Sequence, residues 1–259
     1  MAEIIAIINH KGGTGKTTTT VNLGAALTKK GKKVLLVDLD PQGSLTYHLG
    51  IKGPSFNIAN VMLKEAKMSD IMHEREGMMI ATANSALSDA ELTIAHAQGR
   101  ERFLANALAE VHDQFDFILI DCPPSRSILT INALVASSKV IIPVKLEILS
   151  LEGVKLVSNT IEQVKAVFNP SLQIIGVLPV MYNRTKKGLF SSKSKAQKEN
   201  DHVLSLLISE IKIPVFKSVI SADVLAMQAP SEGQTIFKFA PKSPLVAEYD
   251  LFANELLKK

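Results

Sequence analysis

The chain has 259 residues, 46% of them hydrophobic and 21% charged, with a formal net charge of +4. This length and composition allow one sizeable core, so we expect a single domain over 1–259, and the modest positive charge permits contact with a polyanion without requiring it. The one cysteine, Cys122, excludes an internal disulfide and a cysteine-rich metal site. With no signal-like segment after Met1 and no apolar run near about 18 residues, we expect a cytoplasmic protein.

A glycine-rich loop follows the first predicted strand, the apolar run at 4–8, and leads into a helix expected over 17–30. It reads Lys11-Gly12-Gly13-Thr14-Gly15-Lys16-Thr17-Thr18. The three glycines are expected to adopt positive φ and to bring backbone N–H groups close to phosphate oxygens. Lys16 stands where a P-loop lysine reaches the β- and γ-phosphates, and Thr17 offers a hydroxyl to Mg²⁺. An ordinary strand-to-helix turn is the alternative, which the order of strand, loop, lysine, threonine and helix disfavours.

Two positions depart from the common P-loop pattern: His10 replaces the first glycine, and Lys11 adds a cation at the start of the loop. The spacing alone leaves open whether Lys11 serves its own nucleotide, serves a neighbouring subunit's nucleotide, or is a solvated loop charge. The form K-G-G-T-G-K-T-T resembles the deviant Walker A motif of the ParA/MinD family of P-loop ATPases. That resemblance implies ATP and Mg²⁺ as cofactors and a homodimer in which Lys11 crosses to the partner's nucleotide.

A second apolar run at 34–38 ends in Asp38-Leu39-Asp40-Pro41-Gln42-Gly43, where proline and glycine stop regular structure. Parallel strands place such carboxylates at the edge where open α/β sheets bind ligands. The segment 38–42 is similar to the family's Walker A′ motif, which implies that Asp40 stands near the attacking water. For Asp38, a turn with a helix-capping role is an open alternative.

The region 45–100 is the least regular in pattern. We expect short helices at 58–63 and 87–97 and a strand at 78–81, followed by an amphipathic helix at 101–111. In the family this region is variable and contributes to partner contacts.

The next strand ends in an aspartate. Four apolar residues at 117–120 run into Asp121-Cys122-Pro123-Pro124. A carboxylate at this edge of the sheet suits the magnesium shell. The form resembles the family's D-x-P-P Walker B motif, so Asp121 is predicted to hold Mg²⁺, through water, together with Thr17.

The remaining pattern alternates helices with apolar strands. We expect helices at 128–136 and 147–168 and strands at 139–144, 173–180 and 214–220. The predicted fold class is therefore α/β: a doubly wound, mostly parallel sheet flanked by helices, as in P-loop NTPases.

Asn183 and a basic run follow the strand at 173–180. Resemblance to the family implies that Asn183 pairs with adenine, although an asparagine here also suits a turn. The run carries six basic residues and no acid, which suits nonspecific DNA contacts as well as a solvated loop: Arg184, Lys186, Lys187, Lys193, Lys195 and Lys198. Soj-like relatives usually carry DNA-contacting arginines where this chain has Ser221, Ala222 and Leu225, so DNA binding would depend on the basic run or on other lysines.

A helix expected over 243–259 ends the chain. Its apolar stripe, Leu245, Tyr249, Phe252 and Leu256, is expected to pack on the sheet. A membrane-bound terminal helix, as in MinD-type relatives, is the alternative, which the acidic residues of this helix disfavour.

The resemblance extends over essentially the whole chain, and the chain looks like the short Soj-like ParA branch of the family. It implies an ATPase that is slow alone, dimerises with ATP, binds nucleoid DNA nonspecifically, and positions a plasmid, chromosome or protein cargo with a ParB-like activator. Alternatives are a MinD-like membrane-associated ATPase and a nucleotide-binding scaffold without hydrolysis. A cluster-bearing relative of the nitrogenase iron protein would need more cysteines than Cys122.

Overall fold

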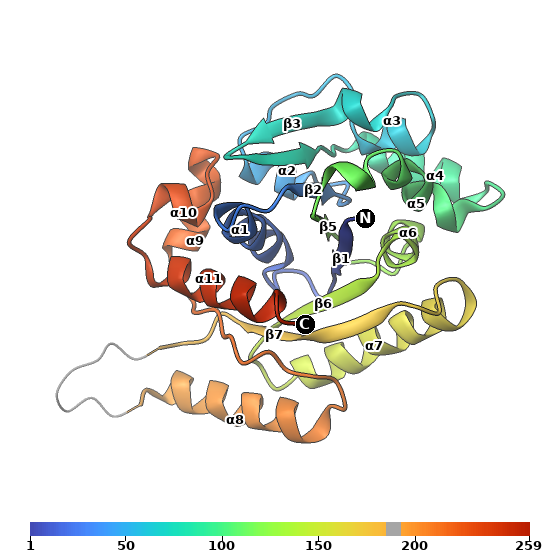
Figure 1. Ribbon diagram of the computed structural model, residues 1–259. Coiled ribbons are helices and arrows are strands. Elements are labelled where there is room, and N and C mark those ends of the chain that lie inside the picture. The colour runs from blue at the N-terminus through green and yellow to red at the C-terminus, as the bar shows by residue number, and fades with distance from the viewer. Residues whose placement is uncertain (185–192) are drawn as a thin grey trace.

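The computed structural model describes residues 1–184 and 193–259, and their strands form a seven-stranded sheet (Figure 1). The strand order is β3-β4-β2-β5-β1-β6-β7, with every pairing parallel except that of β3 with β4. The predicted doubly wound, mostly parallel fold is confirmed. The strands are β1 Glu3–Ile7, β2 Val34–Asp38, β3 Met72–Arg75, β4 Met78–Ala81, β5 Phe117–Asp121, β6 Lys139–Lys145 and β7 Gln173–Val180.

Helices cover both faces of the sheet (Figure 1). One face packs against α4 to α7, and the other packs against α1 and α11. The helices are α1 Lys16–Lys29, α2 Ser44–His48, α3 Ile58–Met62, α4 Ala86–Ala95, α5 Phe103–Ala109, α6 Ile128–Ala136, α7 Ser150–Val167, α8 Lys195–Glu210, α9 Leu225–Gln228, α10 Ile236–Phe239 and α11 Pro244–Leu256. Short 3₁₀ turns lie at Met68–Ile71, Arg100–Arg102, His112–Gln114 and Ala229–Glu232.

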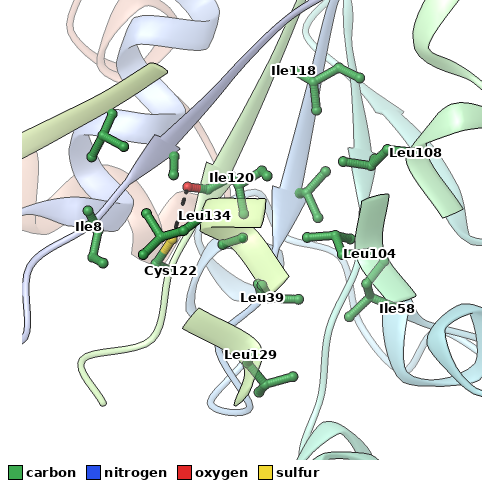
Figure 2. Close-up of a cluster of buried hydrophobic side chains, with 14 of the residues drawn as sticks. Ile8, Leu39, Ile58, Leu104, Leu108, Ile118, Ile120, Cys122, Leu129 and Leu134 are labelled. Atoms are coloured by element: carbon green, nitrogen blue, oxygen red, sulfur yellow. Dashed lines mark hydrogen bonds between the residues drawn. The ribbon is translucent and has the colours of Figure 1, made fainter. Parts of the chain in front are cut away.

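The central strands are buried on both sides, which explains their unbroken apolar sequences. Every residue of β2 and β5 is buried, including the aspartate that ends each strand. Figure 2 shows one of the two cores, where Ile118 and Ile120 of β5 pack with Leu104 and Leu108 of α5. These rigid layers fix the loops at the carboxyl ends of β1, β2 and β5.

The prediction of a strand at 214–220 is wrong, because this segment does not form a regular strand. In the described part of the chain, the segment runs parallel to the outer edge of β7 but makes a single isolated bridge with it, between Val177 and Val215. Pro214 has no N–H to donate, and the N–H groups of Lys217 and Ser218 donate to the Glu255 carboxylate of α11 instead of to a strand. The missing donor and the competing Glu255 carboxylate interrupt the ladder of hydrogen bonds that a regular strand would make with β7.

The terminal helix α11 buries its apolar stripe, as the spacing predicts. Leu245, Tyr249, Phe252 and Leu256 are each at most 2% exposed and belong to the core that includes α1. The acids of this helix are also engaged: Asp250 pairs with Lys30, and Glu255 accepts from residues 217–218. The stripe is thus committed to the core in this conformation. No helix in the described part of the chain is long and apolar enough to span a membrane.

Candidate nucleotide-binding site

The glycine loop joins the carboxyl end of β1 to the first turn of α1. Gly13 and Gly15 adopt positive φ of 70° and 75°, whereas Gly12 does not, which corrects the expectation for that glycine. A β-carbon added at Gly12 or Gly13 would meet no atom of the described residues within 4 Å. Packing within the protein therefore does not demand glycine there, while a ligand approaching the backbone would. Gly15 caps α1 without a side-chain acceptor, so no side-chain cap competes for the N–H groups of that turn.

Thr17 and Asp121 meet beneath this loop. The Thr17 hydroxyl donates to Oδ2 of Asp121 at 2.6 Å, and Oδ1 of Asp121 is buried without a hydrogen-bond partner among the described residues. Lys16 is buried beside them, and its Nζ lies 3.5 Å from the carbonyl oxygen of Lys11. Hydroxyl and carboxylate oxygens are the donors that Mg²⁺ prefers, and an orphan buried carboxylate oxygen is costly without a cation or water. The residues present therefore fit a magnesium ion.

Two buried carboxylates end neighbouring strands. The register of β2 with β5 places Asp38 opposite Asp121. Burial raises the pKa of Asp121 strongly, and the nearby Asp38 carboxylate raises the pKa further. Burial likewise raises the pKa of Asp38, although hydrogen bonds from Thr46 oppose the shift. Such a pair favours binding of a cation, because a cation offsets the cost of two buried negative charges.

The raised pKa of Asp121 gives a stability prediction for the metal-free protein. The folded state retains a proton on Asp121 at pH values where the unfolded chain has lost that proton, so this carboxyl lowers the free energy of unfolding as pH rises above about 4. Urea unfolding at several pH values without Mg²⁺ measures the slope. The difference from Asp121→Asn isolates this carboxyl from His48, whose lowered pKa acts in the opposite direction. Identical pH slopes for the two proteins would contradict the assignment.

The loop after β2 holds Asp40 at the same edge. Asp40 is partly exposed, and its Oδ1 accepts from the N–H of Gln42 at 3.0 Å. Asp38 is fully buried and accepts from the backbone N–H of Thr46 in the first turn of α2 at 2.8 Å. The Asp38 carboxylate therefore satisfies one N–H of the first turn of α2 from the end of β2, while Gly43 is the N-cap residue of that helix.

Lys11 directs its ammonium group to a residue that the sequence patterns did not single out. Its Nζ lies 2.8 Å from Oε2 of Glu147, just after β6, and the other oxygen of Glu147 lies 2.5 Å from Nζ of Lys145. The hydrogen bond from Lys11 lowers the pKa of Glu147. Glu147 follows a buried strand directly at the ligand edge, and that position was the available sequence signal. The Lys11 side chain is 48% exposed, so the cation is accessible from outside the subunit.

A cavity of about 530 Å³ opens beside the loop. Gly15, Thr18 and Asn183 line it together with residues 220–224. The side-chain and backbone N–H groups of Asn183 both donate to Oδ1 of Asn200, which fixes the orientation of the Asn183 amide. The cavity has the location and size for a nucleoside attached to phosphates on the loop.

The predicted DNA-contacting residues that the structure describes differ in their surroundings. Lys186 and Lys187 lie outside the described residues. Arg184 pairs with Glu248 at 3.1 Å, and Lys193 pairs with Asp201 at 2.6 Å. Lys195 and Lys198 are exposed on the first turn of α8, Lys195–Glu210.

These features define a P-loop nucleotide-binding protein. The sheet is mostly parallel, a glycine loop joins its central strand to a helix, and a lysine, a threonine and an aspartate lie together below that loop. Residues 2–174 match a family model described as an AAA domain, and the chain belongs to the ParA/MinD-type P-loop ATPase family. The resemblance noted from the sequence is confirmed.

Three similar proteins cover nearly all of the chain. The sporulation initiation inhibitor protein Soj of Bacillus subtilis is 40% identical over 99% of this chain and 98% of its own length. The chromosome-partitioning ATPase Soj of Thermus thermophilus is 37% identical over 98% of this chain and 95% of its own length. A cobyrinic acid a,c-diamide synthase structure from Mycobacterium smegmatis, with bound ADP and magnesium, has a TM-score of 0.85 and 35% sequence identity. The match covers 100% of this chain and 95% of that chain. The predicted cofactors are confirmed at this level, since homologous structures hold ADP or an ATP analogue with magnesium.

Proposed function

We propose that the protein is a magnesium-dependent ATPase that dimerises when ATP is bound, binds DNA nonspecifically and positions a cargo with the help of a ParB-like activator. The observation that carries the proposal is Lys11, a cation at the start of the loop that is exposed and paired with Glu147. A second subunit can therefore receive this cation. The similarity to two proteins named Soj, one of them named as chromosome-partitioning, supports the cellular role.

In the proposed site, backbone N–H groups of residues 12–18 and the Lys16 ammonium hold the β- and γ-phosphates, and Asn183 faces the adenine. Thr17 and Asp121 hold Mg²⁺, which when bound offsets the negative charge that develops on the phosphoryl oxygens. Asp40 orients the attacking water, and the partner's Lys11 stabilises the negative charge on the γ-phosphoryl group as it passes to that water and ADP leaves. Turnover by the protein alone should be slow, because a nucleotide switch benefits from holding ATP until an activator accelerates hydrolysis.

Sedimentation velocity with ATP and Mg²⁺, run beside a phosphate-release assay, tests the proposal. A dimer that forms with ATP and disappears with ADP supports it, and a monomer under both conditions contradicts it. ATP binding without phosphate release, even with DNA and an activator, would indicate a scaffold. Phosphate release that required a carboxylic acid and an ammonia donor would instead indicate a synthase like the Mycobacterium smegmatis protein.

Nonspecific DNA binding is expected to depend on the basic run. Reversing the charge of Lys186, Lys187, Lys193 and Lys195 to glutamate should weaken binding to random duplex DNA at least about tenfold and reduce the salt slope by about one for each DNA phosphate that the variant no longer neutralises. Fluorescence anisotropy at several salt concentrations measures both quantities. Unchanged affinity would place the DNA-binding surface elsewhere.

The matched comparison for that variant is a second variant that changes another basic surface. A groove of about 650 Å³ along α11 is lined by Arg184, Lys217, Lys258 and Lys259. Its two acids are engaged, because Glu248 pairs with Arg184 and Glu255 accepts from residues 217–218. Reversing Lys217 and Lys258 removes charge there without touching the basic run. A larger loss of DNA affinity in this variant would move the DNA-binding surface to the α11 groove.

Membrane targeting through α11 would have to expose the stripe that is now buried with α1. Cosedimentation with anionic liposomes in ATP tests this alternative. Binding that disappears when residues 244–259 are removed from a protein that stays folded would support it.

A further inference from the structure

We propose that Thr46 is a positioning residue for ATP hydrolysis: through Asp38 it fixes the backbone at Asp40. The inference rests on the proposed role of Asp40 in orienting the attacking water. Thr46 itself lies in α2, six residues beyond Asp40, and is only 4% exposed.

Asp38 is the link between the two. Its Oδ2 accepts two hydrogen bonds from Thr46, one from the backbone N–H and one from the hydroxyl, each at 2.8 Å. Its Oδ1 accepts the backbone N–H of Asp40 at 3.2 Å. One oxygen of the carboxylate is thus fixed by α2, and the other oxygen binds the backbone of the loop. Because its side chain is fully buried, water does not readily replace a broken hydrogen bond.

The Thr46 hydroxyl is itself fixed by the neighbouring strand. It accepts the N–H of Ala83, just beyond β4, at 2.9 Å while donating to Asp38. Gly43, which precedes α2, has a φ of +62°, and a β-carbon there would lie 2.9 Å from the carbonyl oxygen of Ala83. The start of α2 is therefore pressed against the end of β4. One hydroxyl serves as donor and acceptor at this point, a pair of functions that serine has and valine lacks.

The loop that receives this support also makes hydrogen bonds within itself. The N–H of Gln42 donates to the Asp40 carboxylate, and the N–H of Gly43 donates to the Asp40 carbonyl oxygen. Two links join the turn at 40–43 to α2: the backbone hydrogen bond from Tyr47 to Gly43, and the side-chain link through the Asp38 carboxylate, which accepts from Asp40 and from Thr46. Displacing such a turn should alter the position of the Asp40 carboxylate more than the affinity for ATP, because the phosphate loop lies on another strand-to-helix connection.

The test compares Thr46→Val, Thr46→Ser and a matched control, Thr82→Val. Thr82 is also a fully buried threonine, but its hydroxyl has no hydrogen-bond partner among the described residues. We expect Thr46→Val to lower kcat about tenfold with ATP affinity changed less than about twofold, and Thr46→Ser to restore kcat. Thr82→Val should match the wild type. Hydrogen–deuterium exchange should show faster exchange at residues 39–43 in Thr46→Val alone.

Three results would overturn the proposal: unchanged exchange at 39–43 in Thr46→Val, an equal loss of kcat in Thr82→Val, or a fall in ATP affinity that matches the fall in kcat. The exchange measurement needs no turnover. If the wild type released no phosphate, the proposed ATPase function would fail, and with it the catalytic role of Thr46, whereas faster exchange would still show that Thr46 holds the loop.

Discussion

Replacing Asp40 by alanine is expected to lower kcat for ATP hydrolysis at least about 100-fold while the protein remains an ATP-bound dimer. The carboxylate stands at the ligand edge on a turn held by hydrogen bonds to Gln42 and Gly43, so its loss removes the group that would orient water without disturbing the phosphate loop. Phosphate release gives kcat, and sedimentation velocity with saturating ATP and Mg²⁺ gives the oligomeric state.

Asp113→Ala is the control for this variant, because Asp113 is an exposed carboxylate at the far amino-terminal side of the sheet, where its Oδ1 lies 4.0 Å from the terminal amino group of Met1. It should behave as the wild type. Asp40→Ala protein that stays monomeric with saturating ATP would show that nucleotide binding and assembly are not coupled in the proposed way. Wild-type turnover would show that another group orients the water.

Replacing Lys11 by alanine is expected to leave ATP affinity within a few fold of the wild-type value and to abolish both the ATP-dependent dimer and at least about 99% of turnover. Lys16 and the loop N–H groups remain to bind ATP, and Glu147 remains paired with Lys145. Fluorescent-nucleotide titration measures affinity, and sedimentation measures assembly. Lys52→Ala, at an exposed loop lysine, is the control. A large loss of ATP affinity in Lys11→Ala would instead indicate that this lysine serves its own nucleotide.

Local patterns were sufficient to predict most of the sheet and the phosphate loop. The buried parallel strands have unbroken apolar runs, and the loop lies within eight consecutive residues, so neither depends on distant contacts. The strand β3 was missed because Met72–Arg75 carries His, Glu and Arg on a partly exposed antiparallel edge. The segment 214–220 has the apolar character of a strand, but the N–H groups of Lys217 and Ser218 donate to Glu255 of α11.

The contacts that complete the site could not be predicted from the sequence because they join distant positions. The partner of Lys11 lies 136 residues further along, on a loop whose place at the same edge depends on the order of β1 and β6 in the sheet. The hydrogen bond from the N–H of Thr46 to Asp38 depends on the path of the loop between them, and the hydroxyl of Thr46 meets Ala83 only because β4 pairs with β2. Local patterns identify the functional groups, and the strand order decides which of them meet.

Mixing two inactive variants tests most directly whether Lys11 acts across the subunit boundary. In a dimer of Lys11→Ala with Asp40→Ala, one site has its own Asp40 and receives Lys11 from the other subunit, while the second site lacks both. If Lys11 acts in the partner's site, the mixture should recover turnover that neither variant shows alone, because the Lys11 donated by the Asp40→Ala subunit completes the site of the Lys11→Ala subunit. The recovery is about a quarter of wild-type phosphate release when half of the dimers are mixed and each has one complete site. If Lys11 serves its own nucleotide, no site in the mixture is complete, and turnover no higher than the mean of the separate variants would contradict the account.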